Sequence, residues 1–262
     1  LARIASEAYT LTASQHLINS MLAKHEQPAV LSAVMKYETT HRSRLVVNDA
    51  MDVVGGAGIC RGPSNSMGNG YMALPIAITV EGANILTRSM IIFGQGLNRA
   101  HPNLINLIKT LEKGDDVAGF RREVAGFMGH LFSNVGRSLA SYLTPLKSQS
   151  DMVEYYEANL AKQAANFAVC ADLSLILGGR LKFEEMLSGR FADAFGTLYL
   201  GYSCLWYYKQ NENVEGAKEL CRLALENILA QNRAALKGLT ENFPIPGIGP
   251  IMGALMGPFS TK

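Results

Sequence analysis

Apolar side chains recur every three or four residues along most of this 262-residue chain, and no other feature limits its fold as strongly. Such spacing places apolar residues on one face of an α-helix. It predicts helices over residues 2–23, 28–54, 101–112, 117–143, 151–177, 182–209 and 214–237. Another helix is expected after Glu81, with Leu86, Met90, Phe93 and Leu97 on its apolar side. The sequence therefore predicts an all-α protein.

A polar, turn-forming run at residues 113–116 is the clearest boundary in the chain. It predicts two domains, an antiparallel helical bundle over residues 1–112 and a second helical bundle over residues 113–262. In the second domain, the apolar face of the 117–143 helix is expected to face inward. That face consists of Phe120, Val124, Phe127, Leu131, Val135 and Leu139.

Two segments depart from the helical pattern. Glycines crowd residues 55–74, so no continuous helix or strand is expected there, and residues 76–80 are predicted to be extended or a single helical turn. Residues 243–258 are apolar but rich in proline and glycine. They are interpreted as an extended strap packed over the second bundle, with contact to a membrane or a partner as the alternative.

Composition excludes several classes of function. The net charge is only +2, so no nucleic-acid partner is expected. The cysteines lie far apart without a Cys-x-x-Cys pair, which predicts no metal site and fits a reducing cytoplasm. His41 is expected to be a core or interface histidine. No uninterrupted apolar run reaches the roughly 18 residues that span a bilayer.

Glu81 follows an apolar, β-branched run and precedes Gly82 and a helix. One interpretation is that its carboxylate simply stabilises the helix start through the helix dipole. The other is a general base enclosed by apolar neighbours. Residue type alone leaves both open. Beyond residue 114 the helix carboxylates show no catalytic grouping and are expected to lack partners: Asp172, Glu184, Glu185 and Asp193.

Two motifs carry a family resemblance. Val80-Glu81-Gly82-Ala83-Asn84, preceded by residues 48–52 and the Gly-Gly-x-Gly run at 55–58, resembles the C-terminal helical domain of acyl-CoA dehydrogenases. The wider run over residues 56–102 is similar to the large bacterial fatty-acyl-CoA dehydrogenases of β-oxidation. The resemblance implies a fragment of an FAD-dependent enzyme that converts acyl-CoA to trans-2-enoyl-CoA. It also implies that this fragment alone binds FAD weakly and is inactive.

The resemblance also implies roles for individual residues. Glu81 corresponds to the base that removes the α-proton, and Gly82 leaves room for the acyl chain. The residues implied to approach FAD, usually that of a neighbouring subunit, are Asp52, Gly55, Gly56, Gly58 and Asn84. The family usually has Gln where Asp52 stands and Thr where Ala83 stands, so the resemblance implies backbone rather than side-chain contacts to FAD at these two positions.

Partners follow from the same resemblance. It implies an acyl-CoA substrate, electron-transfer flavoprotein as the electron acceptor, and a homo-oligomer. The expected location is the cytoplasm, at the inner-membrane surface if residues 243–258 contact a membrane. Two alternatives remain: an acyl-CoA oxidase, which passes its electrons to oxygen, and a non-catalytic helical assembly module.

Overall fold

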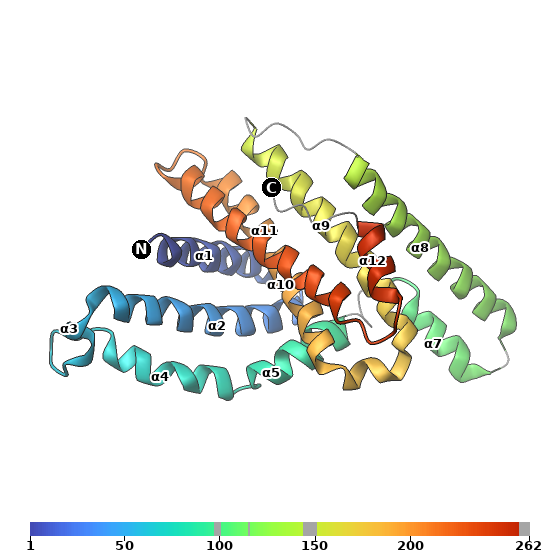
Figure 1. The fold of residues 1–262 in the computed structure, drawn as a ribbon, viewed down its shortest axis with the longest axis horizontal. Helices are drawn as coiled ribbons and strands as arrows, with labels where there is room; N and C mark the ends of the chain where they lie inside the picture. Colours follow the sequence, from blue (N-terminus) through green and yellow to red (C-terminus); the bar gives the residue numbers. More distant parts are fainter. Residues whose placement is uncertain (97–100, 115, 144–150, 257–262) are drawn as a thin grey trace. The chain divides into compact units, whose positions relative to one another are not determined.

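The computed structural model describes residues 1–96, 101–114, 116–143 and 151–256, and within these ranges every regular element is a helix (Figure 1). This confirms the predicted all-α class. The chain packs as two compact units. Unit 1 comprises residues 1–88 and 196–230, and unit 2 comprises residues 89–195 and 231–262. The predicted domains, 1–112 and 113–262, do not coincide with these units, because two long helices contribute to both. The division into domains 1–112 and 113–262 stays a prediction.

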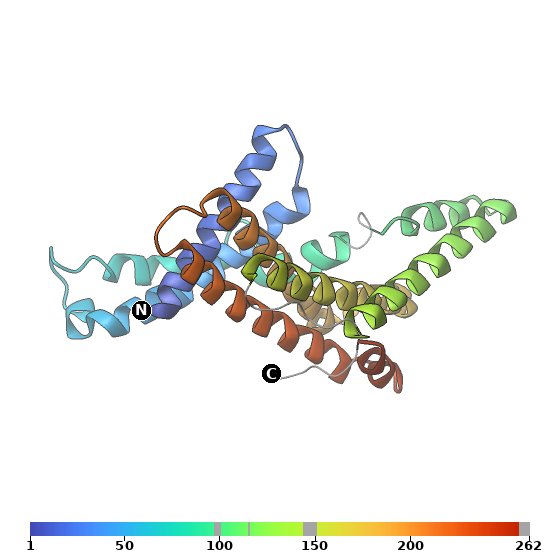
Figure 2. The same ribbon diagram turned by 90° about the horizontal axis from the view of Figure 1, so that it is seen from above.

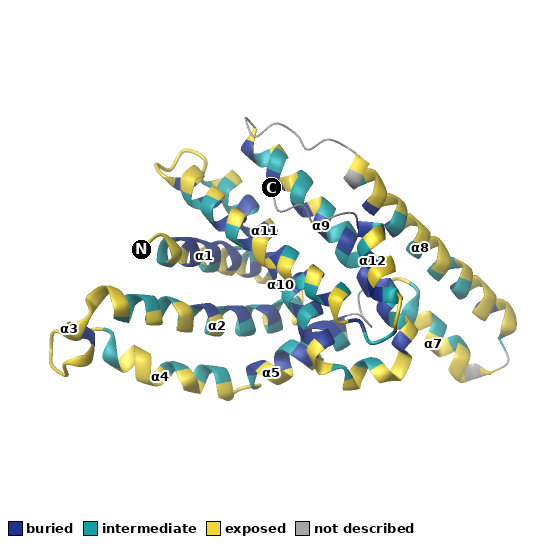
Figure 3. Ribbon diagram, in the orientation of Figure 1, coloured by how far each residue is buried: buried dark blue, intermediate teal, exposed yellow. Residues whose placement is uncertain are grey.

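Unit 1 is an assembly of helices from two separate stretches of the chain. Its own helices are α1 (Ala2–Ala23), α2 (Ala29–Val54), α3 (Gly56–Ile59), α4 (Gly68–Thr79) and α5 (Asn84–Leu86). Residues from Gly196 onward in α10 (Glu185–Gln210) and up to Ala230 in α11 (Ala217–Glu241) complete it. α2 packs between α1 and α4. Figure 3 shows a buried face along α1, whereas α3 and α4 are mostly exposed.

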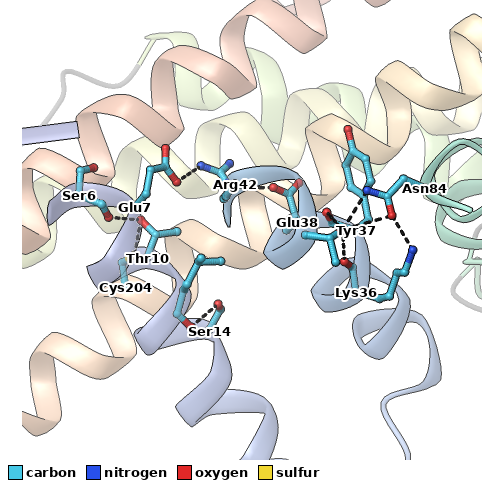
Figure 4. A network of polar contacts seen from close by, with 12 residues as sticks. Ser6, Glu7, Thr10, Ser14, Lys36, Tyr37, Glu38, Arg42, Asn84 and Cys204 are labelled. Carbon is cyan, nitrogen blue, oxygen red and sulfur yellow. Dashed lines mark hydrogen bonds and ion pairs between the residues drawn. The ribbon is translucent and has the colours of Figure 1, made fainter. Parts of the chain in front are cut away.

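The buried face of α2 is polar, which the sequence pattern did not predict. Its fully buried positions are Val34, Glu38 and Arg42. Arg42 donates from Nε to Glu38 and from Nη1 to Glu7 of α1, both at 2.7 Å (Figure 4). His41, expected in the core or at an interface, is instead exposed and stacks on Tyr37. Hydrogen-bonded charges thus occupy the α1–α2 contact, where apolar side chains were expected.

Residues 76–80 are neither extended nor a single turn. Residues 76–79 form the C-terminal turn of the twelve-residue helix α4, which contains Pro75. Proline inside a helix removes a backbone donor and disfavours the helix. α4 has no buried residue, so the carbonyl that loses its partner remains near solvent. This exposure is why the helix tolerates Pro75.

The helix after Glu81 begins at Asn84 and changes into a π-helix, η1 (Thr87–Gln95). A π-helix uses i→i+5 hydrogen bonds, so its faces drift from the α-helical period. The predicted apolar stripe therefore does not form one buried face. Leu86 and Met90 are exposed, Phe93 is buried, and Leu97 lies outside the described residues.

Unit 2 is a second helical assembly. Its elements are the rest of η1, α7 (Leu104–Lys113), α8 (Val117–Leu143), α9 (Met152–Ser174), the 3-10 helix η2 (Leu175–Phe183), α12 (Ile248–Met256), and the parts of α10 and α11 outside unit 1. α8 packs on α7 and α9, and α7 and α8 lie side by side in Figure 1 and in Figure 2. Asp151 caps α9 by accepting the backbone N–H of Glu154.

The fully buried side chains of α8 are polar, whereas the predicted apolar face is half-buried or exposed. Asn134 and Ser138 are fully buried, whereas Phe120 and Leu139 of the predicted face are exposed. Ser138 Oγ lies 2.6 Å from Asn166 Oδ1 on α9. Hydrogen bonds between helices thus set which face of α8 packs.

Helix Met152–Phe183 is long and apolar enough to cross a membrane by length and composition, although no uninterrupted apolar run was found in it. Its polar residues argue for a packed core helix. Asn166 and Asp172 are buried and bonded to α8. Such contacts satisfy polar groups inside a protein core.

Residues 243–256 pack on unit 2, but not as an extended strap. They contain the helix α12, which begins after Gly247 in a left-handed conformation and contacts α8 and α9. Pro250 falls in the first turn of α12, where its missing N–H costs little. Met252 and Met256 are buried. Residues 257–258 of the predicted segment lie outside the described residues.

Candidate functional site

The turn between α4 and α5 carries the candidate base. Glu81 has φ +53° and Gly82 has φ +87°, so two successive residues adopt the left-handed conformation. Glycine accepts this conformation freely, but for glutamate it is uncommon and strained. Strained residues of this kind concentrate at functional sites. Nothing in the residue pattern signals this strain, because Gly82 alone suffices for an ordinary helix start.

The described residues of unit 1 do not form the expected apolar enclosure of Glu81. The side chain is exposed, and α5 begins only at Asn84, so Glu81 does not lie in the first turn of a helix. Its backbone N–H donates to no acceptor among the described residues, whereas the preceding N–H of Val80 closes α4 on Ile76 O. The turn therefore presents a carboxylate and a free N–H side by side.

Side chains of α2 form hydrogen bonds with this turn. Lys36 Nζ donates to Gly82 O at 2.6 Å and to Asn84 Oδ1 at 2.7 Å. Asn84 is buried and donates from Nδ2 to Thr40 Oγ1 at 2.9 Å. Figure 4 shows Lys36 and Asn84 side by side. Sequence analysis missed Lys36 and Thr40; their i, i+4 spacing on one face of α2 was the available signal.

Two of the residues expected near FAD are open to a ligand's approach. Gly55 (φ +58°) and Gly56 are exposed, and a Cβ at either position would meet no atom within 4 Å. A ligand can therefore approach the backbone closely at both positions, which fits a flavin contact, and the Gly55 N–H itself donates to Met51 O. Asp52 is exposed beside them.

The other two residues expected near FAD have structural roles in this chain. A Cβ on Gly58 would lie 2.8 Å from Val54 Cγ2, so its glycine is explained by the packing of α3 on the end of α2. The amide of Asn84 is engaged by Lys36 and Thr40. The 55–58 turn and the Glu81 turn lie at opposite ends of α4, about 18 Å long at 1.5 Å per residue (Figure 1). Unit 1 therefore does not bring them together.

Unit 2 contains a buried polar cluster that sequence analysis did not predict. Asp172 was expected to lack partners, but it accepts from Asn134 Nδ2 at 2.7 Å and lies 3.2 Å from His130 Nδ1. His101 Nε2 lies 3.4 Å from Asp172 Oδ1. Glu184 also has a partner, Arg180, at 2.9 Å. The cluster joins α8, α9 and the bend before α7, so no local spacing could have revealed it.

The hydrogen bonds of His101 decide what the cluster can do. Its Nδ1 accepts the backbone N–H groups of Asn103 and Leu104, each at 3.2 Å, at the start of α7. A neutral imidazole accepting at Nδ1 carries its proton on Nε2. Burial lowers the pKa of His101 below its ordinary value of 6.5, with Asp172 opposing and His130 adding to the shift. Nε2 is thus a donor without a lone pair, so His101 cannot ligate a metal in this arrangement.

An apolar cavity of about 880 Å³ adjoins this cluster. Its lining comes from η1, α7, α8, α9 and η2, with Leu104, Phe127 and Leu173 among the apolar residues and Asp172 among the few polar ones. Phe127 also stacks on His101 at 5.2 Å. The cavity lies wholly within unit 2, whereas the Glu81 turn belongs to unit 1.

Comparison with known proteins agrees with the helical fold. Residues 98–262 match the family model described as acyl-CoA dehydrogenase, C-terminal, bacterial type. Among solved structures, the chain is similar to an acyl-CoA dehydrogenase complexed with FAD from Bacillus anthracis. The two share 15% sequence identity with a TM-score of 0.70, over 97% of this chain and 43% of that one. This chain thus spans less than half of that protein. It belongs to the bacterial type of the acyl-CoA dehydrogenase C-terminal family.

Proposed function

We propose that this chain is the base-bearing part of an FAD-dependent acyl-CoA dehydrogenase of fatty-acid β-oxidation. In the proposed reaction, Glu81 removes a proton from Cα of an acyl-CoA, and the product is a trans-2-enoyl-CoA. The observation that carries the proposal is the left-handed Glu81, whose N–H is free and whose carboxylate is unpaired among the described residues. A turn that only began a helix would not need this conformation.

The chemistry follows from the two groups that the turn presents. The α-proton of a thioester is weakly acidic, so a base must lie close to it. As the proton leaves, negative charge develops on the thioester oxygen, and a hydrogen-bond donor fixed beside that oxygen stabilises it. The free N–H of Glu81 is suited to this task. Gly82 has no side chain to obstruct an acyl chain there.

FAD, when bound, supplies the acceptor for the hydride from Cβ. In this chain the open backbone at Gly55 and Gly56 would contact it, with Asp52 beside them. Because this turn lies far along α4 from Glu81, we assign it to the flavin of a neighbouring subunit. A homo-oligomer is therefore part of the proposal.

Glu81 is exposed among the described residues of unit 1. The Bacillus anthracis structure is more than twice as long as the aligned part of this protein, and a base for α-proton removal needs a desolvated site. We therefore propose that the remainder of the full-length enzyme covers Glu81. For the same reason, this chain alone should bind FAD weakly and dehydrogenate nothing.

The further partners are proposals of the same kind. Electron-transfer flavoprotein is the proposed acceptor, and the cytoplasm is the proposed location. Contact with the inner-membrane surface through residues 243–258 is the least supported proposal, because Met252 and Met256 are already buried against unit 2.

Replacement of Glu81 by Gln in the full-length enzyme tests the proposal. The variant should retain FAD, seen in its absorbance spectrum, and lose turnover by at least about 10²-fold, within the range for removing a general base. Glu81→Asp is the matched control and should retain part of the activity. Unchanged turnover in Glu81→Gln would exclude Glu81 as the base. Peroxide formation by the wild type would indicate an oxidase, and absence of turnover would favour a non-catalytic assembly module.

A further inference from the structure

The turn at Glu81 is held in its left-handed conformation by groups outside itself. Left-handed conformations at non-glycine residues persist only where the surroundings impose them. Here the carbonyl of Gly82 accepts Lys36 Nζ at 2.6 Å and Thr87 Oγ1 at 3.3 Å. The ammonium contact is charge-assisted and much the shorter of the two, so it is the stronger restraint.

Lys36 also donates to a second residue that follows Glu81, the buried Asn84. Its ammonium has three donors, and another of them meets Asn84 Oδ1 at 2.7 Å. Asn84 is fixed in turn, because its Nδ2 donates to Thr40 Oγ1 while the Thr40 hydroxyl donates to Lys36 O at 2.8 Å. The Lys36 side chain is half-buried rather than free in solvent. It therefore connects α2 to both sides of the turn that follows Glu81.

We infer that Lys36 is a positioning residue that fixes the direction of the Glu81 side chain and N–H through its bond to the Gly82 carbonyl. This inference rests on the proposed function of Glu81. Lys36 acts on the backbone and not on the substrate. Without it, the turn can relax toward an ordinary right-handed conformation, which redirects both groups. A misplacement of about 1 Å can cost on the order of 10²-fold in rate.

Hydrogen exchange in this 262-residue chain gives a test that needs no cofactor or activity. Lys36→Met should speed exchange of the amides in residues 80–87 by about tenfold or more and leave α1 unchanged. Lys24→Met is the matched control, since Lys24 is exposed and its side chain makes no hydrogen bond or ion pair with the described residues. Unchanged exchange in residues 80–87 would overturn the inference.

Kinetics of the full-length enzyme give the second test. Lys36→Met should lower kcat by about 10- to 100-fold per bound flavin, with KM within about threefold, because positioning affects the transition state. The primary isotope effect from deuterium at Cα should increase, as proton removal becomes slower. Lys36→Arg, which keeps a charged donor, should recover part of kcat. Thr40→Val leaves both hydrogen bonds of Lys36 Nζ in place and should lower kcat less than Lys36→Met does.

The two proposals fail in different ways. If Glu81→Gln keeps full turnover, the proposed base is wrong whatever Lys36 does. If Glu81→Gln loses turnover while Lys36→Met keeps kcat and the isotope effect of the wild type, only the role of Lys36 is wrong. A loss of kcat that Lys36→Arg does not relieve at all, with an unchanged isotope effect, would also contradict positioning.

Discussion

Replacement of Arg42 by Met is expected to destabilise unit 1 more than any other single change at the α1–α2 contact. Arg42 lies between Glu7 and Glu38, each 2.7 Å away, and all three side chains are 5–6% exposed. Burial alone would lower the pKa of Arg42, but Glu38 and Glu7 together raise it above its ordinary value. Without the arginine, the buried carboxylates of Glu7 and Glu38 lose the cation that lies between them.

The expected loss of stability in Arg42→Met follows from this change in buried charge. Removing one partner of a buried ion pair costs about 3–5 kcal/mol, because an uncompensated charge stays buried. Glu38→Gln instead leaves one cation with one anion, and should cost about 1–2 kcal/mol for a weakened charge-assisted hydrogen bond. The deficit of Arg42→Met should also shrink as the pH falls from about 7 to 5, since protonation of either carboxyl relieves the repulsion.

Hydrogen exchange measured on α1 and α2 reports this loss without requiring the whole chain to unfold in one step. A cost of about 3–5 kcal/mol corresponds to exchange faster by about two to three and a half orders of magnitude. Glu38→Gln is the matched variant. Exchange in Arg42→Met within tenfold of the wild type, or no faster than in Glu38→Gln, would refute the reasoning.

Two further predictions concern unit 2. Gly249→Ala should loosen the packing of α12 and cost at least about 1–3 kcal/mol, because the new Cβ would clash with the backbone oxygen of Thr240. Gly253→Ala in the same helix is the control: its Cβ meets no atom within 4 Å, and the change should be neutral or slightly stabilising. The rates of proteolysis within residues 243–256 should be faster in Gly249→Ala than in Gly253→Ala. The free energy of unfolding should fall as the pH drops below 6.5, because the pKa of His101 is lowered in the fold and the unfolded chain then binds more protons. His101→Asn keeps a hydrogen-bond acceptor for the start of α7 and should make the free energy of unfolding less dependent on pH. Urea titrations at several pH values measure this, and a dependence as steep as that of the wild type would contradict the role of His101.

The helices were predictable from sequence because their apolar residues keep the helical period over many turns. Their buried faces were less predictable. The α1–α2 and α8–α9 contacts are polar, and the partners of Arg42 and Asp172 lie on other helices, so no local pattern shows which face packs. The π-helical segment shifted the period after Glu81 and moved Leu86 and Met90 to the surface.

The site was predictable only in part. The Glu-Gly motif identified Glu81 through family resemblance, while residue type alone left the choice between base and helix start open. Positive φ at Glu81 and the contacts from Lys36 depend on how α2 lies against the turn. Side-chain packing across 46 positions of sequence cannot be read from spacing.

Exchange of the α-protons of a saturated acyl-CoA with deuterated water, catalysed by the full-length enzyme, tests the role of Glu81 most directly. It reports proton removal at Cα itself, whatever accepts the electrons afterwards. We expect the wild type to exchange these protons and Glu81→Gln, with FAD still bound, to exchange them at least about 10²-fold more slowly. Exchange by Glu81→Gln at the wild-type rate would contradict the assignment of the base.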